Sequence, residues 1–414
     1  MGSKRPARRE FLKSGAALAG GFTLGAAAPA IGQTPASPPM IKGDKDMIAY
    51  GDRSRFVTSV RIAHGGRPSP DAYGLVFHVA APLQDSVGVI TPSSLHFVGT
   101  TRGSYIPQID PQEHRLMIHG MVERPLTFTM DDLKRLPSVT RLHFIECAGN
   151  RTSRRAKTVQ ETHGMTSCAE WTGVPLSLLL KECGVKRGAA WFVAEGTEEV
   201  KGASSMPIAK AMDDCFVAYG MNGEALRPQQ GFPLRLMVPG FEGIFHTKYL
   251  RRIKVTERYY MNYNDFGHMD QDSIEAALGY QIGPKSVITF PSGGQQLPGR
   301  GFYEIRGLAW SGGGAVRKVE VSTDGGKRWN TAEIKGTAQR MAHARFTYQW
   351  NWDGKETEIQ SRCTDELGSV QPSRAQVAKY FNKPFDASFQ VPGLDNTIQP
   401  WRIASDGSVT NGNA

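Results

Sequence analysis

The sequence changes character near residue 283, and this change limits the folds open to the chain. Before residue 265, helical and strand patterns mix without the regular alternation of a doubly wound sheet, and no Gly-x-Gly-x-x-Gly motif occurs. Beyond residue 283 the patterned segments alternate apolar and polar residues. Mixed patterns predict an α+β domain, and successive short strands predict a β-sandwich.

The first part contains two helices whose ends are marked in the sequence. Pro175 and Gly184 enclose an apolar stretch, and Met130–Leu136 has acidic residues in its first turn and a basic pair in its last. Pro at the start, Gly at the end and this charge order are typical of helix termini. Strand patterns cover Arg115–Gly120, Trp191–Ala194, Phe232–Pro239 and Tyr249–Thr256.

The second part predicts a sandwich of immunoglobulin type over residues 284–400. The turn Thr323–Gly326 lies between two strand patterns and has the composition of a tight hairpin. The strand patterns are Phe302–Gly307, Val316–Ser322, Arg345–Trp350 and Thr357–Arg362. A sandwich of this kind often binds another copy of the same protein.

The N-terminus predicts export. Arg8 and Arg9 form a twin-arginine pair, an uncharged segment follows from Ser14 to Thr34, and Ala28–Ala30 provides small residues for cleavage. We expect a signal peptide over 1–33, a periplasmic protein without a membrane span, and an extended arm over 34–84. The twin-arginine route carries folded proteins, which indicates that a cofactor is inserted before export.

Composition excludes some classes of function. The 414 residues carry a net charge of +10 but no dense Lys/Arg block with interleaved aromatic residues, so we expect no nucleic-acid partner. The number of cysteines is odd, and neither Cys-x-x-Cys nor Cys-x-x-Cys-His occurs. We therefore expect no c-type haem on this chain. The pairing of the remaining cysteines stays open: Cys168, Cys183, Cys215 and Cys363.

Cys147 is the candidate reactive residue. A strand pattern over Leu142–Ile145 leads to it, and Ala148–Asn150 then breaks the strand. Such a thiol lies at the lip of a loop, where ligands and nucleophiles are often found. Nearby cations would favour the thiolate, which binds soft metals: Arg151, Arg154, Arg155 and Lys157. The alternative is a buried cysteine that acts as a small apolar residue.

Several segments together resemble the sulfite oxidase family, and they occur in that family's order. They are Cys147–Arg151, Trp171–Leu176, Tyr219–Glu224, Gly231–Arg235, Pro239–Gly240, Lys248–Leu250 and the hairpin Ser322–Trp329. The resemblance covers about residues 85–400. It implies a molybdopterin-binding α+β domain over 85–265, a β-sandwich dimerisation domain over 284–400, and a molybdenum–molybdopterin cofactor.

The resemblance also implies roles for individual residues. By similarity Cys147 is the molybdenum ligand at the catalytic centre, and a thiolate suits such a metal. Arg235 and Lys248 match positions that contact the pterin or its phosphate, and His246 matches a polar contact. Without the resemblance, Arg235 and Lys248 would be read as ordinary solvated cations. The reaction implied is oxygen-atom transfer to sulfur.

Departures from the family pattern bear on the substrate. Gly99, Thr152 and Glu170 stand where family members that oxidise free sulfite carry basic residues, although Arg102 is close. Fewer cations should hold a free dianion poorly. These departures, with His96–Arg102, Gly283–Val287 and Pro298–Tyr303, look more like the sulfane dehydrogenase branch, the molybdenum subunit of the Sox thiosulfate-oxidising system.

This branch implies particular partners. Its substrate is a sulfane sulfur on a sulfur-carrier protein, its electron acceptor is a c-type cytochrome subunit, and the sandwich forms a homodimer. The alternative within the family is a periplasmic sulfite dehydrogenase that acts on free sulfite. The alternative from another class is a cofactor-free exported binding protein.

Overall fold

The structure, a computed structural model, describes residues 53–54, 56–64, 77–100, 106–150, 155–197, 203–261, 281–385 and 394–413. Residues Ser59–Ala414 form one compact unit. The predicted signal peptide over 1–33 lies outside the described residues, as do Arg102, Arg151, Thr152 and Arg154. Within the described ranges, no helix is both long enough and apolar enough to cross a membrane.

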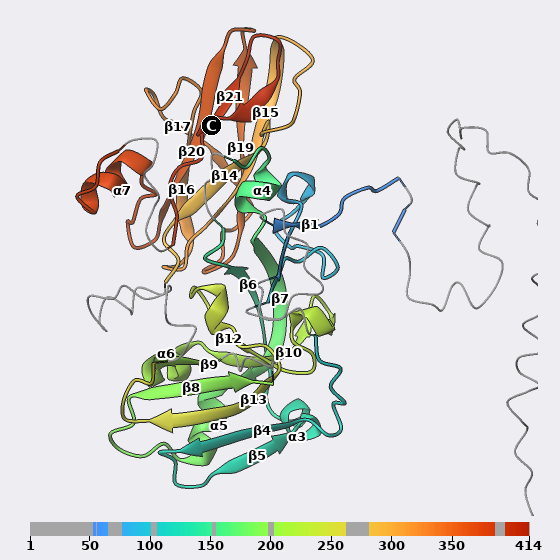
Figure 1. Cartoon of the computed structure of the whole chain (residues 1–414), viewed down its shortest axis with the longest axis vertical. Helices are drawn as coiled ribbons and strands as arrows, with labels where there is room; N and C mark the ends of the chain where they lie inside the picture. Colours follow the sequence, from blue (N-terminus) through green and yellow to red (C-terminus); the bar gives the residue numbers. More distant parts are fainter. Residues whose placement is uncertain are drawn as a thin grey trace, which may run out of the picture. The chain divides into compact units, whose positions relative to one another are not determined.

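A five-stranded sheet carries the candidate cysteine (Figure 1). Its strands are β6 (Val139–Glu146), β7 (Thr166–Pro175), β10 (Phe216–Met221), β11 (Glu224–Ala225) and β12 (Arg235–Met237). The strand predicted before Cys147 is therefore confirmed as β6. The strand predicted over Phe232–Pro239 is shorter than its apolar pattern, because only Arg235–Met237 pairs with β10.

A second five-stranded sheet forms the other layer of the N-terminal domain. Its strands are β4 (Arg115–Gly120), β5 (Leu126–Thr129), β8 (Trp191–Gly196), β9 (Ala203–Pro207) and β13 (Leu250–Thr256). β4 and β13 pair in parallel, whereas β8 pairs with β13 antiparallel. Mixed pairing of this kind fits the predicted α+β class.

Helices of the N-terminal domain are short. They are α3 (Met130–Arg135), α4 (Val159–His163), α5 (Leu176–Cys183) and α6 (Ile208–Asp213), with 3-10 turns η3 (Leu83–Asp85), η4 (Pro228–Gln230) and η5 (Gly243–Phe245). As predicted, α5 begins after Pro175 and ends at Gly184, whose φ of 68° is the left-handed conformation of a helix C-terminus. The predicted α3 begins with a capping box between Thr129 and Asp132.

The arm predicted over 34–84 contributes two short strands. β1 (Ile62–Ala63), β2 (Phe77–Ala80) and β3 (Val98–Thr100) form a three-stranded antiparallel sheet. In this sheet His78 lies opposite Gly99. The Pro/Gly-rich sequence around these strands hides their pattern, yet they bring histidines to the site described below.

The C-terminal part is a sandwich of two sheets, as predicted (Figure 1). One sheet contains β14 (Lys285–Phe290), β15 (Gly301–Trp310), β18 (Glu333–Lys335) and β19 (Ala344–Trp352). The other contains β16 (Val316–Ser322), β17 (Asn330–Thr331), β20 (Thr357–Asp365), β21 (Trp401–Ile403) and β22 (Val409–Asn411), so it continues past residue 400. Helix α7 (Arg374–Tyr380) follows β20.

The predicted hairpin turn joins two paired strands of the sandwich. Glu320 lies opposite Thr331, so β16 and β17 form the hairpin. Gly325 and Gly326 have φ values of 72° and 83°, which explains the glycines in the turn. The Gly326 amide also donates to the Ser322 hydroxyl oxygen at 2.8 Å.

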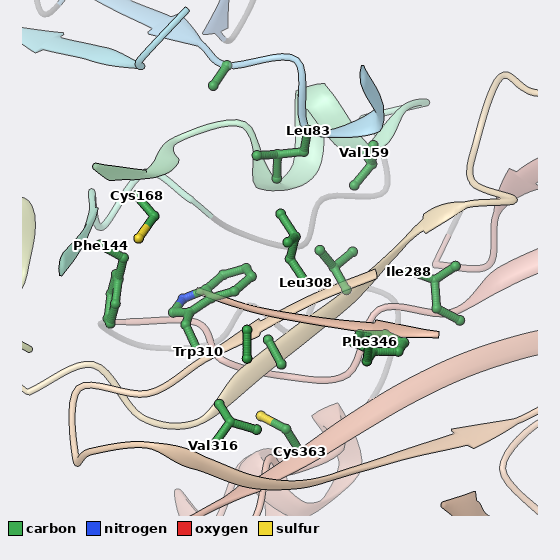
Figure 2. Close-up of a cluster of buried hydrophobic side chains, with 14 of the residues drawn as sticks. Leu83, Phe144, Val159, Cys168, Ile288, Leu308, Trp310, Val316, Phe346 and Cys363 are labelled. Carbon is green, nitrogen blue, oxygen red and sulfur yellow. The ribbon is translucent and has the colours of Figure 1, made fainter. Parts of the chain in front are cut away.

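The hydrophobic core does not divide at the boundary between the two predicted domains. Figure 2 shows Phe144 of β6 and Cys168 of β7 beside Trp310 and Leu308 of β15. These side chains belong to one buried cluster that continues into the sandwich, whereas a second cluster joins the two sheets of the N-terminal domain and includes Val217 of β10 and Ile253 of β13. The sheet that carries Cys147 is therefore packed directly on the C-terminal domain.

Candidate functional site

Cys147 follows the last residue of β6, is half-buried and forms no disulfide. Its amide donates to the Met165 carbonyl at 3.0 Å, which continues the pairing of β6 and β7 by one residue. The Gly149 amide points back to the Cys147 Sγ at 3.4 Å. A hydrogen bond to sulfur favours the thiolate over the thiol. The strand end thus presents a sulfur that a soft metal could bind.

The turn after Cys147 is closed by its own side chains. Asn150 is 2% exposed, and its amide donates to the Cys147 carbonyl at 2.9 Å. Its side-chain Nδ2 donates to Glu146 Oε1 at 2.7 Å, and its Oδ1 accepts from the Met165 amide at 3.1 Å. The Ala148 amide donates to a Glu242 carboxylate oxygen at 3.1 Å. The thiol is therefore held in a defined place.

Lys248 contacts strand β3 through Gly99. Its ammonium Nζ donates to the Gly99 carbonyl at 3.1 Å, and it lies 5.5 Å from the centre of the Tyr249 ring. A Cβ on Gly231, whose φ is 102°, would lie 2.9 Å from the Lys248 Cβ. Glycine at 231 therefore leaves the room that the Lys248 side chain occupies.

Arg235 is buried on β12, not solvated. Its guanidinium lies 4.9 Å from the centre of the Trp171 ring and donates to the Gln230 and His246 carbonyls at 3.0 and 3.2 Å. Only 3% of the residue is exposed. A buried guanidinium in this place is suited to an anionic ligand.

His246 forms hydrogen bonds with the backbone around it. Its Nδ1 accepts from the Val238 amide at 3.3 Å, so its Nε2 carries the proton that is shared with the Phe241 carbonyl at 3.2 Å. Burial, followed by the Arg235 charge, lowers its pKa well below the ordinary value. The ring is neutral and closes the loop between Val238 and Phe241.

Two histidines at this site were not predicted from the sequence. His64 Nε2 lies 3.0 Å from the Gly149 carbonyl, and the His64 and His78 ring centres are 6.2 Å apart. A Cβ on Gly149 would lie 3.7 Å from the Cys147 Sγ and 3.8 Å from the His78 Nδ1. Both atoms therefore border the same small space. The only available signal was the occurrence of histidines in a Pro/Gly-rich arm.

The residues of the site fall into two connected groups. His78, Gly99 and Lys248 link the space beside Cys147 to the Lys248 ammonium, because His78 pairs with Gly99 and Lys248 binds the Gly99 carbonyl. Arg235 and His246 form the second group and touch through the His246 carbonyl.

Glu170 does not belong to this site. It is exposed on β7 opposite Leu142, five residues before Cys147 on β6. Five strand residues span roughly 16 Å. The repulsion that the sequence suggested between this carboxylate and a substrate at Cys147 therefore finds no support in the structure.

The other four cysteines are buried and free: Cys168, Cys183, Cys215 and Cys363. Burial raises the pKa of Cys168 to about 12 and raises the pKa of the other three above the ordinary value. These thiols are buried and protonated. None of the four forms a disulfide, which settles the pairing that the sequence left open. Cys147 differs from them in its exposure.

The residues present fit an anionic, sulfur-bound metal cofactor. A half-buried thiol lies at a turn that carries Gly149, and two cations, Lys248 and Arg235, lie on neighbouring segments. Gly231 keeps space beside one of these cations. Thiolate suits the metal, and ammonium and guanidinium groups suit a phosphate.

Two family models match the chain in the expected order. Residues 103–264 match the oxidoreductase molybdopterin binding domain, and residues 277–382 match the Mo-co oxidoreductase dimerisation domain. The first match covers the sheet that leads to Cys147, and the second covers most of the sandwich. They confirm the α+β molybdopterin domain followed by a dimerisation domain.

Similar proteins include sulfur-oxidising and nitrate-reducing enzymes. Rat mitochondrial sulfite oxidase is 34% identical over 68% of this chain and 57% of its own length. Tomato nitrate reductase (NADH) is 33% identical over 69% of this chain and 36% of its own length. The chain therefore spans about a third to three-fifths of these relatives.

A solved structure matches over most of both chains. The sulfane dehydrogenase SoxCD from Paracoccus pantotrophus superimposes with a TM-score of 0.79 at 35% identity, over 90% of this chain and 95% of that one. Fold, domain order and sequence identity agree with the resemblance drawn from the motifs. The chain belongs to the sulfite oxidase family of molybdenum enzymes.

Proposed function

We propose that this chain is the molybdenum subunit of a sulfane dehydrogenase and oxidises sulfane sulfur held on a cysteine of a carrier protein. The observation that carries the proposal is the likeness to a solved sulfane dehydrogenase chain, of which this chain covers 95% at 35% identity. The matched part of rat sulfite oxidase is 57% of that protein.

Gly99 supports the choice of substrate. A free-sulfite enzyme needs cations around a small dianion, and glycine at this position brings none. The space that a side chain here would enter borders His78, since a Cβ on Gly99 would lie 3.5 Å from the His78 Cδ2. Burial, then the charges of His64 and Lys248, lower the pKa of His78 to about 4, so its ring is neutral at neutral pH.

The proposed roles of the site residues follow from their chemistry. When bound, the molybdenum cofactor supplies oxygen-atom transfer and takes up two electrons. Cys147 provides its thiolate ligand, while Lys248 and Arg235 bind the anionic pterin and its phosphate. His246 keeps the loop beside Arg235 in place. Each oxygen atom that water gives to sulfur releases two protons, and with a pKa of about 4 the His78 ring would stay neutral beside Cys147 and bind water by a hydrogen bond.

The proposal extends to location and partners. The twin-arginine pair Arg8–Arg9 supports export of the folded protein to the periplasm. The match to a dimerisation domain supports a homodimer formed through the sandwich. Two electrons must leave the site, and because the sequence lacks Cys-x-x-Cys-His, a separate c-type cytochrome subunit is the proposed acceptor.

A substrate comparison tests this function. The purified, molybdenum-containing protein would be given free sulfite or a carrier protein with persulfidated cysteine, together with an artificial electron acceptor. We expect turnover on the carrier and little on free sulfite. The Cys147→Ser variant is expected to lose activity on both, because a hydroxyl is a poor ligand for a soft metal.

Other outcomes would favour the alternatives. Rapid turnover at low free sulfite would support a periplasmic sulfite dehydrogenase, which the 34% identity to rat sulfite oxidase also favours. Absence of molybdenum from protein folded with its cofactor-inserting machinery would instead support a binding protein without a cofactor. Retained activity in Cys147→Ser would contradict the assignment of the ligand.

A further inference from the structure

A buried ion pair connects the sandwich to the strand that ends at Cys147. Lys285 Nζ of β14 lies 2.8 Å from Glu146 Oε1, and the two side chains are 1% and 3% exposed. The residues are separated by 139 positions in the sequence. Buried ion pairs contribute little net stability, because the loss of hydration offsets the attraction between the charges. This pair therefore calls for a role other than stability.

The Lys285 ammonium also reaches the far end of the turn. It donates to the Asn150 carbonyl at 2.7 Å in addition to the Glu146 carboxylate. Glu146 precedes Cys147, and the Asn150 amide is bonded to the Cys147 carbonyl. One cation from the C-terminal domain thus holds the residues on both sides of the cysteine. Lys285 and Cys147 also line the same small cavity.

Trp310 completes the coordination of the carboxylate. Its indole Nε1 donates to Glu146 Oε2 at 2.6 Å, while Lys285 and Asn150 use Oε1. In Figure 2 the Trp310 ring lies among core side chains of β6 and the sandwich. Because this ring is fixed by packing, the carboxylate it binds has little freedom to move.

We propose that Lys285 is a positioning residue, through which the C-terminal sandwich sets the place of the Cys147 thiol. Lys285 does not touch the reacting atoms and acts through Glu146 and Asn150. The inference uses the proposed function only in treating Cys147 as the ligand. The sandwich would then have a second role beside dimerisation, because its first strand completes the turn that carries this ligand.

Alkylation of Cys147 tests the proposal without the metal. The full-length, metal-free protein would be treated with iodoacetamide, and modified peptides would be quantified by mass spectrometry. The four buried cysteines serve as internal references for intact folding. Lys285→Met removes the cation, and Glu146→Gln combined with Lys285→Met leaves no buried charge behind. Lys318→Met is the control, since Lys318 lies on the same domain with 48% of its side chain exposed.

The turn should loosen in both variants at position 285. We expect Cys147 to be alkylated at least about tenfold faster, because the variants lose both hydrogen bonds of a charged donor. The double variant should show this while keeping a wild-type unfolding midpoint, and Lys318→Met should behave as wild type. In protein loaded with molybdenum, the thiolate-to-metal absorption band should shift in the double variant.

A folded double variant with the wild-type alkylation rate would overturn the proposal. That result would remain decisive if Lys285→Met failed to fold, because the double variant removes both charges together. Failure of the proposed function is distinguishable: a protein that never contains molybdenum would lack the absorption band, while the alkylation rates would still show whether Lys285 holds the turn.

Discussion

At the scale of single residues, Gly149 borders the Cys147 thiol. The position of its missing Cβ lies in ordinary contact distance of both the Cys147 Sγ and the His78 ring, at 3.7 and 3.8 Å. A methyl group would therefore fit without a clash but would occupy the space between them. We expect Gly149→Ala to fold normally and to lose on the order of tenfold in kcat/KM, as for one methyl group in a substrate pocket.

Gly88→Ala is the matched control for this variant, because nothing lies within 4 Å of the Cβ it would add. Thermal unfolding of both variants would show that the fold is intact, and steady-state assays would give kcat/KM. An unchanged kcat/KM in Gly149→Ala would mean that substrate does not approach between Cys147 and His78.

At the scale of elements, the turn after β6 depends on an uncharged Asn150. Its Nδ2 donates to Glu146 Oε1 at 2.7 Å, and its Oδ1 accepts from the Met165 amide. Asn150→Asp keeps the shape but places a carboxylate against Glu146. We expect this buried repulsion to lower the free energy of unfolding by about 2–4 kcal/mol. Urea unfolding measures the change, and Asn351→Asp at an exposed position is the control. An Asn150→Asp variant with the same unfolding midpoint as this control would contradict the prediction.

Elements that are marked by local sequence patterns could be predicted, whereas elements that depend on distant contacts could not. β4, β6, β16 and α5 were found because local alternation, proline and glycine mark them. β14 was not, since five of its six residues are buried and leave no alternation to read. The fold class and the motif around Cys147 are likewise local patterns in the chain.

Contacts between residues that are far apart in the sequence could not be predicted from it. No local pattern links Lys285 to Glu146, and only folding brings the two residues together across 139 positions of the sequence. His78 lies in the Pro/Gly-rich arm without a recognisable motif, and only the pairing of β2 with β3 places it opposite Gly99. Glu170 was wrongly associated with the pocket, because its position depends on the register of β6 and β7.

On the scale of the whole molecule, the two domains share one hydrophobic core, so we expect them to unfold together at acidic pH. His96, His143 and His343 are buried in or beside the interface between β6, β7 and the sandwich. Burial lowers the pKa of His96 and His343 to about 3 and that of His143 to about 4. His343 stacks on Phe144 at 6.0 Å and bonds to the Thr166 hydroxyl at 3.0 Å, so its neutral ring joins both domains.

These histidines predict loss of stability as the pH falls. In the unfolded chain they take up protons below the ordinary pKa of 6.5, whereas the native rings stay neutral until about pH 3–4. The unfolded state therefore binds more protons, and at about pH 5 each ring lowers the free energy of unfolding by about 2 kcal/mol relative to neutral pH. Urea unfolding across this range measures the loss. His343→Gln should reduce it by the share of one histidine while both domains still unfold together. A free energy of unfolding that stays constant down to about pH 5 would show that these rings are protonated in the native protein.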